Sequence, residues 1–379
     1  MASIIFVYRP DPRVGDLPGE PPSLVNMAYI RWFRMAGELA AFGHSVTMAL
    51  PDGVPLRAPA GVSSRLKYVS LSAARWDEYD VVKTYMHRGF DTLSRYGGAG
   101  HPFLISKLGS VVAEQDREGI YFYGDVRKRL YETQARIAAV SQFVTVLNEQ
   151  GRQLFAESHG RATNILCIPG AVDSTLPSVG PDPYPESGGV ARVLFAGTVY
   201  SDAQQPEANR TLVRKLNALG QMIGSRGCRL FLMGDGDISA LDGRHVTWLG
   251  AVPCHRSWDY LRHADVGIVV AAGRVHHNNE STKIYSYLRV GLPVVTESGF
   301  PNESLVSKTG HGFVVAADDL DEMANRIVTA STMQWDGQRA RNYILRNHTW
   351  RHRAAVYDSL LRRRFGPANA ALAPAGMKV

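Results

Sequence analysis

The segment from residue 280 to residue 295 limits what this chain can fold into more than any other. It starts with the polar turn Glu-Ser-Thr-Lys at 280–283, continues as a helical pattern and ends in the strand-like run Gly-Leu-Pro-Val-Val at 291–295. A loop, a helix and a buried strand in this order are the repeating unit of an α/β domain. The first helical turn has free N–H groups and a partial positive charge of about half a unit, so hydroxyls and a lysine there can hold a diphosphate. Lys283 is therefore the leading candidate for a nucleotide-phosphate site, and a plain helix cap with an exposed lysine is the alternative.

The same alternation of apolar, strand-like runs with helical patterns continues along the whole chain. Strands are expected at 3–8, 43–50, 81–85, 102–106, 143–147, 165–168, 191–197, 229–234, 246–249, 266–270, 294–296 and 312–315. Long helices are expected at 23–42, 207–224 and 350–365. A chain of 379 residues is too long for one ordinary core. We predict an α/β protein with two Rossmann-like, doubly wound domains that face a cleft.

A polar stretch rich in proline, glycine and serine follows the strand at 165–168 and places the domain boundary. We expect an N-terminal domain at 1–175 and a C-terminal domain at 176–349. The last helix, at about 350–365, is expected to pack back on the N-terminal domain. The tail 366–379, rich in alanine and proline, is expected to be flexible.

Composition restricts the classes of partner. Hydrophobic residues make up 45% and charged residues 20%, no apolar run approaches the roughly 20 residues of a spanning helix, and no signal segment precedes the first strand, so we expect a cytoplasmic protein. The net charge of +7 favours anionic partners. We interpret the basic clusters 127–129 and 362–364 as solvated helix faces. A peripheral contact with the inner face of the membrane stays open, and nucleic acid is not expected. The spacing of the three cysteines predicts no metal site.

Four motifs occur in an order that is typical of one family. They are Gly-His-Ser-Val-Thr at 43–47, Ile-Pro-Gly-Ala-Val-Asp at 168–173, Val-Leu-Phe-Ala-Gly at 193–197 and Leu-Met-Gly-Asp-Gly at 232–236. Together they resemble glycosyltransferases of the GT-B architecture, and are most similar to the retaining family 4 and to related bacterial exopolysaccharide and glycolipid transferases. The resemblance covers most of the chain.

This resemblance implies an activity and its substrates. A nucleotide sugar, either a UDP-sugar or a GDP-sugar, would be held by the C-terminal domain, and a glycan, glycolipid or small-molecule acceptor by the N-terminal domain. Transfer to an acceptor hydroxyl would occur in the cleft, with retention of configuration and without an obligatory metal. The nucleotide sugar would be a substrate, and no cofactor is expected.

The chain departs from the family pattern at its charged positions. Family 4 usually has Glu-x7-Glu before the Gly-x-Pro-Val-Val strand, and these two positions hold Asn278 and Ser286 here. Glu280 lies between them. The Arg and Lys that often follow the first strand of the donor domain are replaced after Gly197, where Thr198 stands. The phosphate-binding role therefore shifts to Lys283.

The candidate site residues fall into three groups. Those expected to bind the donor are glycines that let a diphosphate approach and polar groups around it: Gly197, Thr198, Gly234, Asp235, His277, Ser281, Thr282, Lys283 and Ser286. An acceptor hydroxyl has to lose a proton, and the catalytic candidates are His87, Asp116 and Glu280. If transfer retains configuration, the leaving phosphate can take that proton and no protein base is needed. Arg9 and Arg13 are candidates for acceptor binding, and solvated surface arginines are the alternative.

Two other functions stay open at this point. An epimerase of the same architecture would act on the nucleotide sugar alone. A nucleotide- or glycan-binding protein without catalysis is the other alternative, because Asn278 and Ser286 replace the usual carboxylates.

Overall fold

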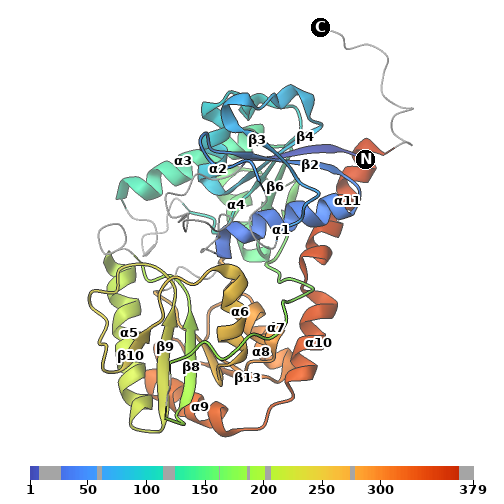
Figure 1. Cartoon of the computed structure of the whole chain (residues 1–379). Helices are drawn as coiled ribbons and strands as arrows, with labels where there is room; N and C mark the ends of the chain where they lie inside the picture. Colours follow the sequence, from blue (N-terminus) through green and yellow to red (C-terminus); the bar gives the residue numbers. More distant parts are fainter. Residues whose placement is uncertain are drawn as a thin grey trace, which may run out of the picture.

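The chain folds into two lobes, each built on a parallel sheet, as the computed structural model in Figure 1 shows. The first sheet has the strand order β3-β2-β1-β4-β5-β6-β7 and the second has the order β10-β9-β8-β11-β12-β13. Every pair of neighbouring strands is parallel. The predicted fold class is confirmed. The structure describes residues 1–7, 27–57, 62–113, 124–161, 163–185, 188–200, 206–273 and 278–366.

The first lobe alternates strands and helices from the start of the chain. Its elements are β1 Ser3–Val7, α1 Met27–Ala41, β2 Ser45–Leu50, β3 Lys67–Ser70, β4 Val81–Tyr85, α2 Met86–Arg95, β5 Leu104–Lys107, α3 Gly124–Val140, β6 Phe143–Val146, α4 Glu149–His159 and β7 Ile165–Cys167. The sequence missed β3. This strand is an edge strand with no fully buried residue, so its sequence lacks the apolar run that marks the others.

The second lobe repeats the plan. Its elements are β8 Ala191–Ala196, α5 Pro206–Gly224, β9 Cys228–Met233, β10 Val246–Trp248, α6 Cys254–Arg262, β11 Val266–Val269, α7 Thr282–Val290, β12 Val294–Glu297, α8 Ser304–Thr309, β13 Gly312–Val315, α9 Leu320–Thr332 and α10 Gly337–Asn347. Strand β8 lies between β9 and β11, so the strand order reverses there. In open α/β sheets ligands bind beyond the carboxyl ends of the strands at such a point, which for this lobe begins at Gly197.

The last helix, α11 Trp350–Phe365, leaves the second lobe and packs on the first (Figure 1). Its residues Ala354, Tyr357 and Leu361 belong to the same buried cluster as Phe6 and Trp32. The Tyr357 hydroxyl donates to Thr145 Oγ1 at 3.0 Å. The helix therefore completes the core of the first lobe, although it begins more than 180 residues after the last strand of that lobe's sheet. The domain limits at 175 and 349 stay a prediction.

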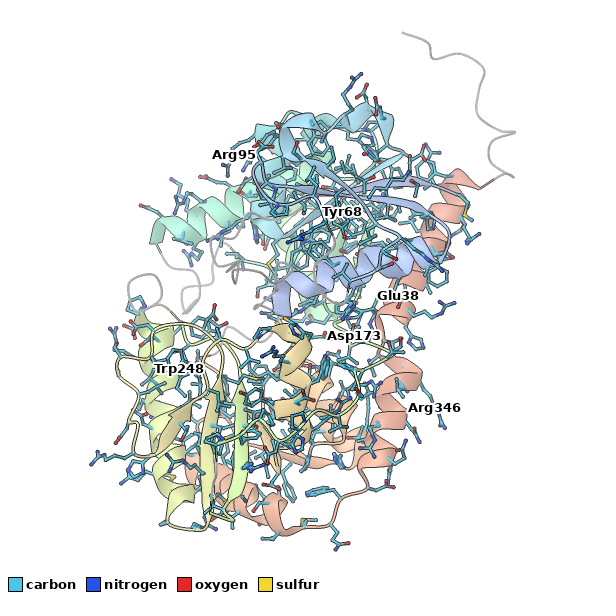
Figure 2. All side chains as sticks on the ribbon, in the orientation of Figure 1. Glu38, Tyr68, Arg95, Asp173, Trp248 and Arg346 are labelled. Atoms are coloured by element: carbon cyan, nitrogen blue, oxygen red, sulfur yellow. The ribbon has the colours of Figure 1, made fainter. Side chains whose placement is uncertain are left out.

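The chain crosses between the lobes twice at one place. Val172 on the outward crossing and Thr349 on the return form a parallel bridge. The Val172 N–H donates to the His348 carbonyl at 3.0 Å, and the Trp350 N–H donates to the Val172 carbonyl at 3.1 Å. Beside this crossing, Arg34 of α1 pairs with Asp173 at 2.8 Å, and Figure 2 shows Asp173 where the lobes meet. The two chain segments that connect the lobes thus lie side by side and are hydrogen-bonded to each other.

The basic clusters lie on helices of the first lobe. Residues 127–129 are on α3 and residues 362–364 are on α11, and all three arginines of the latter are exposed. In the part of the chain that the structure covers, no helix combines the length and the apolar character needed to cross a bilayer.

Replacing Tyr357 by alanine should destabilise the first lobe. The ring is 1% exposed and its hydroxyl is bonded, so truncation leaves a cavity and removes a hydrogen bond, with an expected loss of about 3 kcal/mol or more in the free energy of unfolding. Val356→Ala, on the adjacent and 43% exposed position, should change that free energy by less than about 0.5 kcal/mol. Urea unfolding of both variants measures the contrast. Equal effects of the two substitutions would show that α11 does not complete this core.

Candidate active site

A cavity of about 270 Å³ lies at the carboxyl ends of β8 and β9. Helices α6 and α7 of the second lobe and α1 of the first lobe surround it, and in Figure 1 α6 lies directly below α1. It is lined by Arg31, Ala196, Gly197, Thr198, Tyr200, Met233, Gly234, Asp235, Val252, Cys254, Ser257, Trp258, Leu261, Thr282, Lys283, Ser286 and Tyr287. Residues from both lobes therefore enclose the point where the strand order of the second sheet reverses.

Two glycines, Gly197 and Gly234, lie on one side of this cavity, where their backbones are exposed without side chains and are packed closely against their neighbours. A Cβ atom on Gly234 would collide with the Gly197 carbonyl group. A Cβ atom on Gly197 would lie 2.5 Å from Lys283 Cε and 3.0 Å from Nζ. Any side chain at Gly197 would therefore displace the lysine. Next to these glycines, Thr198 Oγ1 donates to Asp235 Oδ1 at 2.8 Å.

Lys283 is the central cation of the cavity. It stands in the first turn of α7, and its Nζ lies 4.9 Å from the centroid of the Phe195 ring. Burial, and to a smaller extent the charge of Arg31, lowers the pKa of Lys283 to about 8. Arg31 reaches the same turn from α1, where its Nη2 donates to Thr282 Oγ1 at 2.9 Å. Two positive groups from different lobes thus meet at the positive end of a helix.

The hydroxyls around α7 differ in how they are used. The Ser281 backbone is fixed by Asn302, whose Oδ1 accepts from the Ser281 N–H at 3.0 Å and whose Nδ2 donates to the Ser281 carbonyl at 2.8 Å. The Ser281 side-chain oxygen is buried and has no hydrogen-bond partner among the described residues. Ser286, one turn further on, is 8% exposed and lines the cavity. Of these two serines, Ser286 lines the cavity and Ser281 does not.

Glu280 and Asn278 connect the lobes. Glu280 Oε2 accepts from the Gly170 N–H at 2.6 Å, and burial raises the pKa of this carboxyl while that hydrogen bond opposes the shift. Asn278 binds both backbone groups of Val111 in the first lobe: its Oδ1 accepts from the N–H at 2.9 Å and its Nδ2 donates to the carbonyl at 3.0 Å. Neither residue lines the cavity.

His87 lies outside the cavity. It is 7% exposed, and its Nε2 is 3.1 Å from Gln134 Oε1. Burial lowers the pKa of His87 to about 4, so the imidazole is neutral at pH 7. Gln134 also holds the backbone of Val112, accepting from its N–H at 2.9 Å and donating to its carbonyl at 2.8 Å. The surroundings of His87 are those of a buried structural histidine.

The structure therefore brings together part of the expected site. Gly197, Thr198, Gly234, Asp235, Thr282, Lys283 and Ser286 line one cavity. Ser281 adjoins them in the chain, whereas Glu280 and His87 do not contribute to the lining. Arg9, Arg13, Asp116 and His277 lie outside the described residues. Within the described ranges, no group of three or more histidine, cysteine, aspartate or glutamate side chains is arranged to hold a metal ion.

Two cations that the sequence analysis missed lie at the cleft. Arg31 comes from the second turn of α1, and no motif marks it. Lys107 is the last residue of β5, and its Nζ is buried without a hydrogen-bond partner in the described part of the chain. Lys107 could have been found, because it ends an apolar strand and so stands at the sheet edge where ligands bind.

The comparisons with known proteins agree with this site. Residues 191–332 match the family model described as Glycosyl transferases group 1, and this segment contains all the cavity residues except Arg31. No curated protein sequence matches the chain.

Solved structures match over almost the whole length. Sucrose-phosphate synthase from Thermosynechococcus elongatus aligns with a TM-score of 0.68 at 16% identity, covering 96% of this chain and 99% of the other. HepE of Anabaena in complex with UDP and glucose aligns with a TM-score of 0.65 at 12% identity, covering 96% and 100%. The UDP-forming α,α-trehalose-phosphate synthase from Burkholderia vietnamiensis gives 0.62 at 12% identity, with 98% of each chain covered. At such low identity the likeness establishes the fold.

The two-lobed fold, with its cavity at the reversal of the second sheet, is that of GT-B glycosyltransferases. Residues 191–332 match the model of the glycosyl transferases group 1, and the protein is a glycosyltransferase.

Replacing Lys283 by methionine should make the unliganded protein more stable at pH 7. Below pH 8 the lysine is charged in both the folded and the unfolded states, so the folded state bears the whole cost of burying it beside Arg31. Between pH 8 and its ordinary pKa of 10.5, the folded protein loses this proton first and the cost disappears. The gain in melting temperature should therefore be largest at pH 7 and vanish near pH 10.5.

Thermal unfolding at both pH values measures this effect. Lys308→Met, at an exposed lysine of α8, is the matched control and should change neither melting temperature. A lower melting temperature for the Lys283 variant at pH 7 would contradict the electrostatic description of the site.

Proposed function

We propose that the protein transfers a hexose from a UDP-sugar to a hydroxyl group of a glycan, glycolipid or small-molecule acceptor, with retention of configuration and without a metal. The observation that carries this proposal is the pair Lys283 and Arg31, which meet at the first turn of α7 and form no ion pair among the described residues. Sugar transfer leaves a nucleoside diphosphate with growing negative charge, and fixed cations stabilise that charge best. Here each lobe supplies one cation, Arg31 from the first and Lys283 from the second.

The neighbouring residues have distinct roles in this proposal. Gly197 and Gly234 let the diphosphate approach the backbone, and the N–H groups of the first turn of α7 bind its oxygens together with Ser281 and Thr282. Ser286, Thr198 and Asp235 bind the ribose hydroxyls. Lys283 takes over the phosphate-binding role that an Arg and a Lys after β8 have in the family. His277 beside the donor sugar stays a prediction.

The same residues support a reaction in which the leaving group takes the acceptor proton. The bond between the sugar carbon and the β-phosphate oxygen breaks, and a bond to the acceptor oxygen forms on the same face. The acceptor proton passes to a phosphate oxygen of the departing UDP. Because His87 is hydrogen-bonded to Gln134 outside the cavity and Glu280 accepts from Gly170, we assign neither as the general base in this proposal.

We assign the donor to the lobe at 176–349 and the acceptor to residues 1–175 with α11. HepE was solved in complex with UDP and glucose, and the trehalose-phosphate synthase is UDP-forming, which supports UDP over GDP as the nucleotide. We also propose a cytoplasmic location, with the exposed arginines of α11 available for contact with the inner face of the membrane. Acceptor binding by Arg9 and Arg13 and a catalytic role of Asp116 stay predictions.

UDP should raise the melting temperature of the wild-type protein, and Lys283→Met should weaken its binding by about 10-fold or more, because a charge-assisted contact to the diphosphate is lost. At 100 times the dissociation constant, bound UDP stabilises the folded state by about 2.7 kcal/mol. Thermal shift with UDP and GDP followed by calorimetry measures both effects, and Lys308→Met should bind like the wild type. If the Lys283 variant bound UDP with unchanged affinity, the assignment of Lys283 to the donor diphosphate would be wrong.

Release of UDP from a UDP-sugar should depend on an added acceptor. A transferase hydrolyses its donor only slowly when no acceptor is present, whereas an epimerase converts the donor alone. Chromatographic analysis of a UDP-sugar panel, with and without glycan and sugar acceptors, separates the two. Rapid interconversion of UDP-sugars without UDP release would replace this proposal by the epimerase.

A further inference from the structure

The ammonium group of Lys107 in the first lobe is buried and has no hydrogen-bond partner among the described residues. Lys107 is the last residue of β5, in register with Tyr85 of β4 and Thr145 of β6. Its Nζ lies 5.9 Å from the centroid of the Tyr85 ring and makes no hydrogen bond with any described residue. Burying an ammonium group in this way is unfavourable unless an anion compensates it.

The position of Lys107 is on the side of the first lobe that faces the second. The carboxyl ends of parallel strands form the ligand-binding edge of a sheet. Four residues after Lys107, the backbone of Val111 is bound by Asn278 of the second lobe through two hydrogen bonds. Glu280, two residues further on, lies within electrostatic reach of the lysine. A ligand at Lys107 would therefore lie between the lobes.

Positive charge exceeds negative charge around this position. Arg31 is the cation that acts on Lys107, and Lys83, whose pKa burial lowers well below its ordinary value, is a second lysine within electrostatic reach of it. Lys83 is 1% exposed and lies 4.5 Å from the ring centroid of Tyr357 and 5.3 Å from that of Trp32, without a hydrogen-bond partner among the described residues. The nearby carboxylate, Glu280, already accepts from Gly170. In this wall of the first lobe, the two cations Lys107 and Arg31 thus have one carboxylate, Glu280, acting on Lys107, which leaves an excess of positive charge.

The wall of the first lobe around Lys107 is separate from the donor cavity. Lys107 is not among the residues that line the cavity, whereas Arg31 is. The charge of Arg31 lowers the pKa of Lys283 and also that of Lys107. Neither lysine is among the groups that shift the pKa of the other. Arg31 is therefore close to both lysines, of which Lys283 lines the cavity and Lys107 does not.

We infer that Lys107 and Arg31 form a second anion site, on the wall of the first lobe, and that the acceptor carries an oxyanion that binds there. A phosphate ester and a carboxylate share the chemistry that this site recognises. The inference rests on the proposed transfer reaction, since it assigns a chemical class to the acceptor of that reaction. The donor diphosphate is left to Lys283, with Arg31 shared between the two substrates.

Inorganic phosphate tests the site directly. It is titrated into the full chain in the presence of saturating UDP, with chloride added to keep the ionic strength constant, and binding is followed by calorimetry and thermal shift. The wild type should bind phosphate, and Lys107→Met should weaken that binding by about 10-fold or more while UDP affinity is unchanged. Lys67→Met, at the exposed lysine of β3 in the same sheet, should behave like the wild type.

The folding of the variant is checked in the same experiment. Methionine replaces an unpaired buried charge by an apolar side chain of similar length, so the melting temperature of unliganded Lys107→Met should equal or exceed that of the wild type. Loss of phosphate binding with a retained melting temperature then reports on the site itself.

Transfer assays identify which oxyanion the acceptor carries. With the UDP-sugar that the enzyme turns over, a hexose, a hexose 6-phosphate and a hexuronic acid are compared as acceptors, and kcat/KM should be highest for one of the two anionic sugars. Lys107→Met should remove that preference and leave slow donor hydrolysis unchanged.

Each failure has a separate meaning. If phosphate binds no better than chloride while UDP binds, the inference is overturned and the proposed function stands. If Lys107→Met loses UDP affinity as Lys283→Met does, Lys107 belongs to the donor site and the inference is again overturned. If UDP does not bind the wild type, the proposed function fails, and the phosphate titration without UDP still decides whether Lys107 binds an anion.

Discussion

The burial of cations where the two lobes face each other is the constraint on which the site depends. Lys283 and Lys107 both have pKa values of about 8, chiefly because burial disfavours their charged forms and also because Arg31 lies near each of them. Such an arrangement is unfavourable in the empty protein and becomes favourable when anions fill it. The cores of the two sheets hold these groups in place at the expense of some stability, which is common at functional sites.

The contacts between the lobes explain how that arrangement is maintained. Three of them start from the segment 278–282, where Asn278 binds Val111, Glu280 binds Gly170 and Thr282 accepts from Arg31. This short segment therefore positions the first turn of α7 against the first lobe at several points. Asn278 stands where family 4 usually has a carboxylate, and here its amide can both donate and accept, which suits the two backbone groups of Val111 better than a carboxylate would.

The sequence allowed the fold and much of the cavity to be predicted, for a physical reason. Buried parallel strands such as β1 and β11 are nearly continuous apolar runs, so the expected strands 3–8 and 266–270 agree with them to within one residue. Gly197, Gly234 and Lys283 follow or precede such elements and were therefore found. Arg31 was missed because its role arises from the approach of α1 to α7, which no local pattern encodes. Glu280 was expected to act on substrate, and its hydrogen bond to Gly170 is a tertiary contact that the sequence does not reveal.

The paired crossing at Val172 and Thr349 determines how a ligand of any size can enter. Because both covalent links between the lobes pass through one hydrogen-bonded point, a relative rotation of the lobes has its axis there. Displacement in such a rotation grows with distance from the axis. The space between the lobes would therefore widen least beside α11 and most on the opposite side, towards α5 and β10 (Figure 1). Long acceptors would thus be admitted from that opposite side, with their reacting end nearest the pivot.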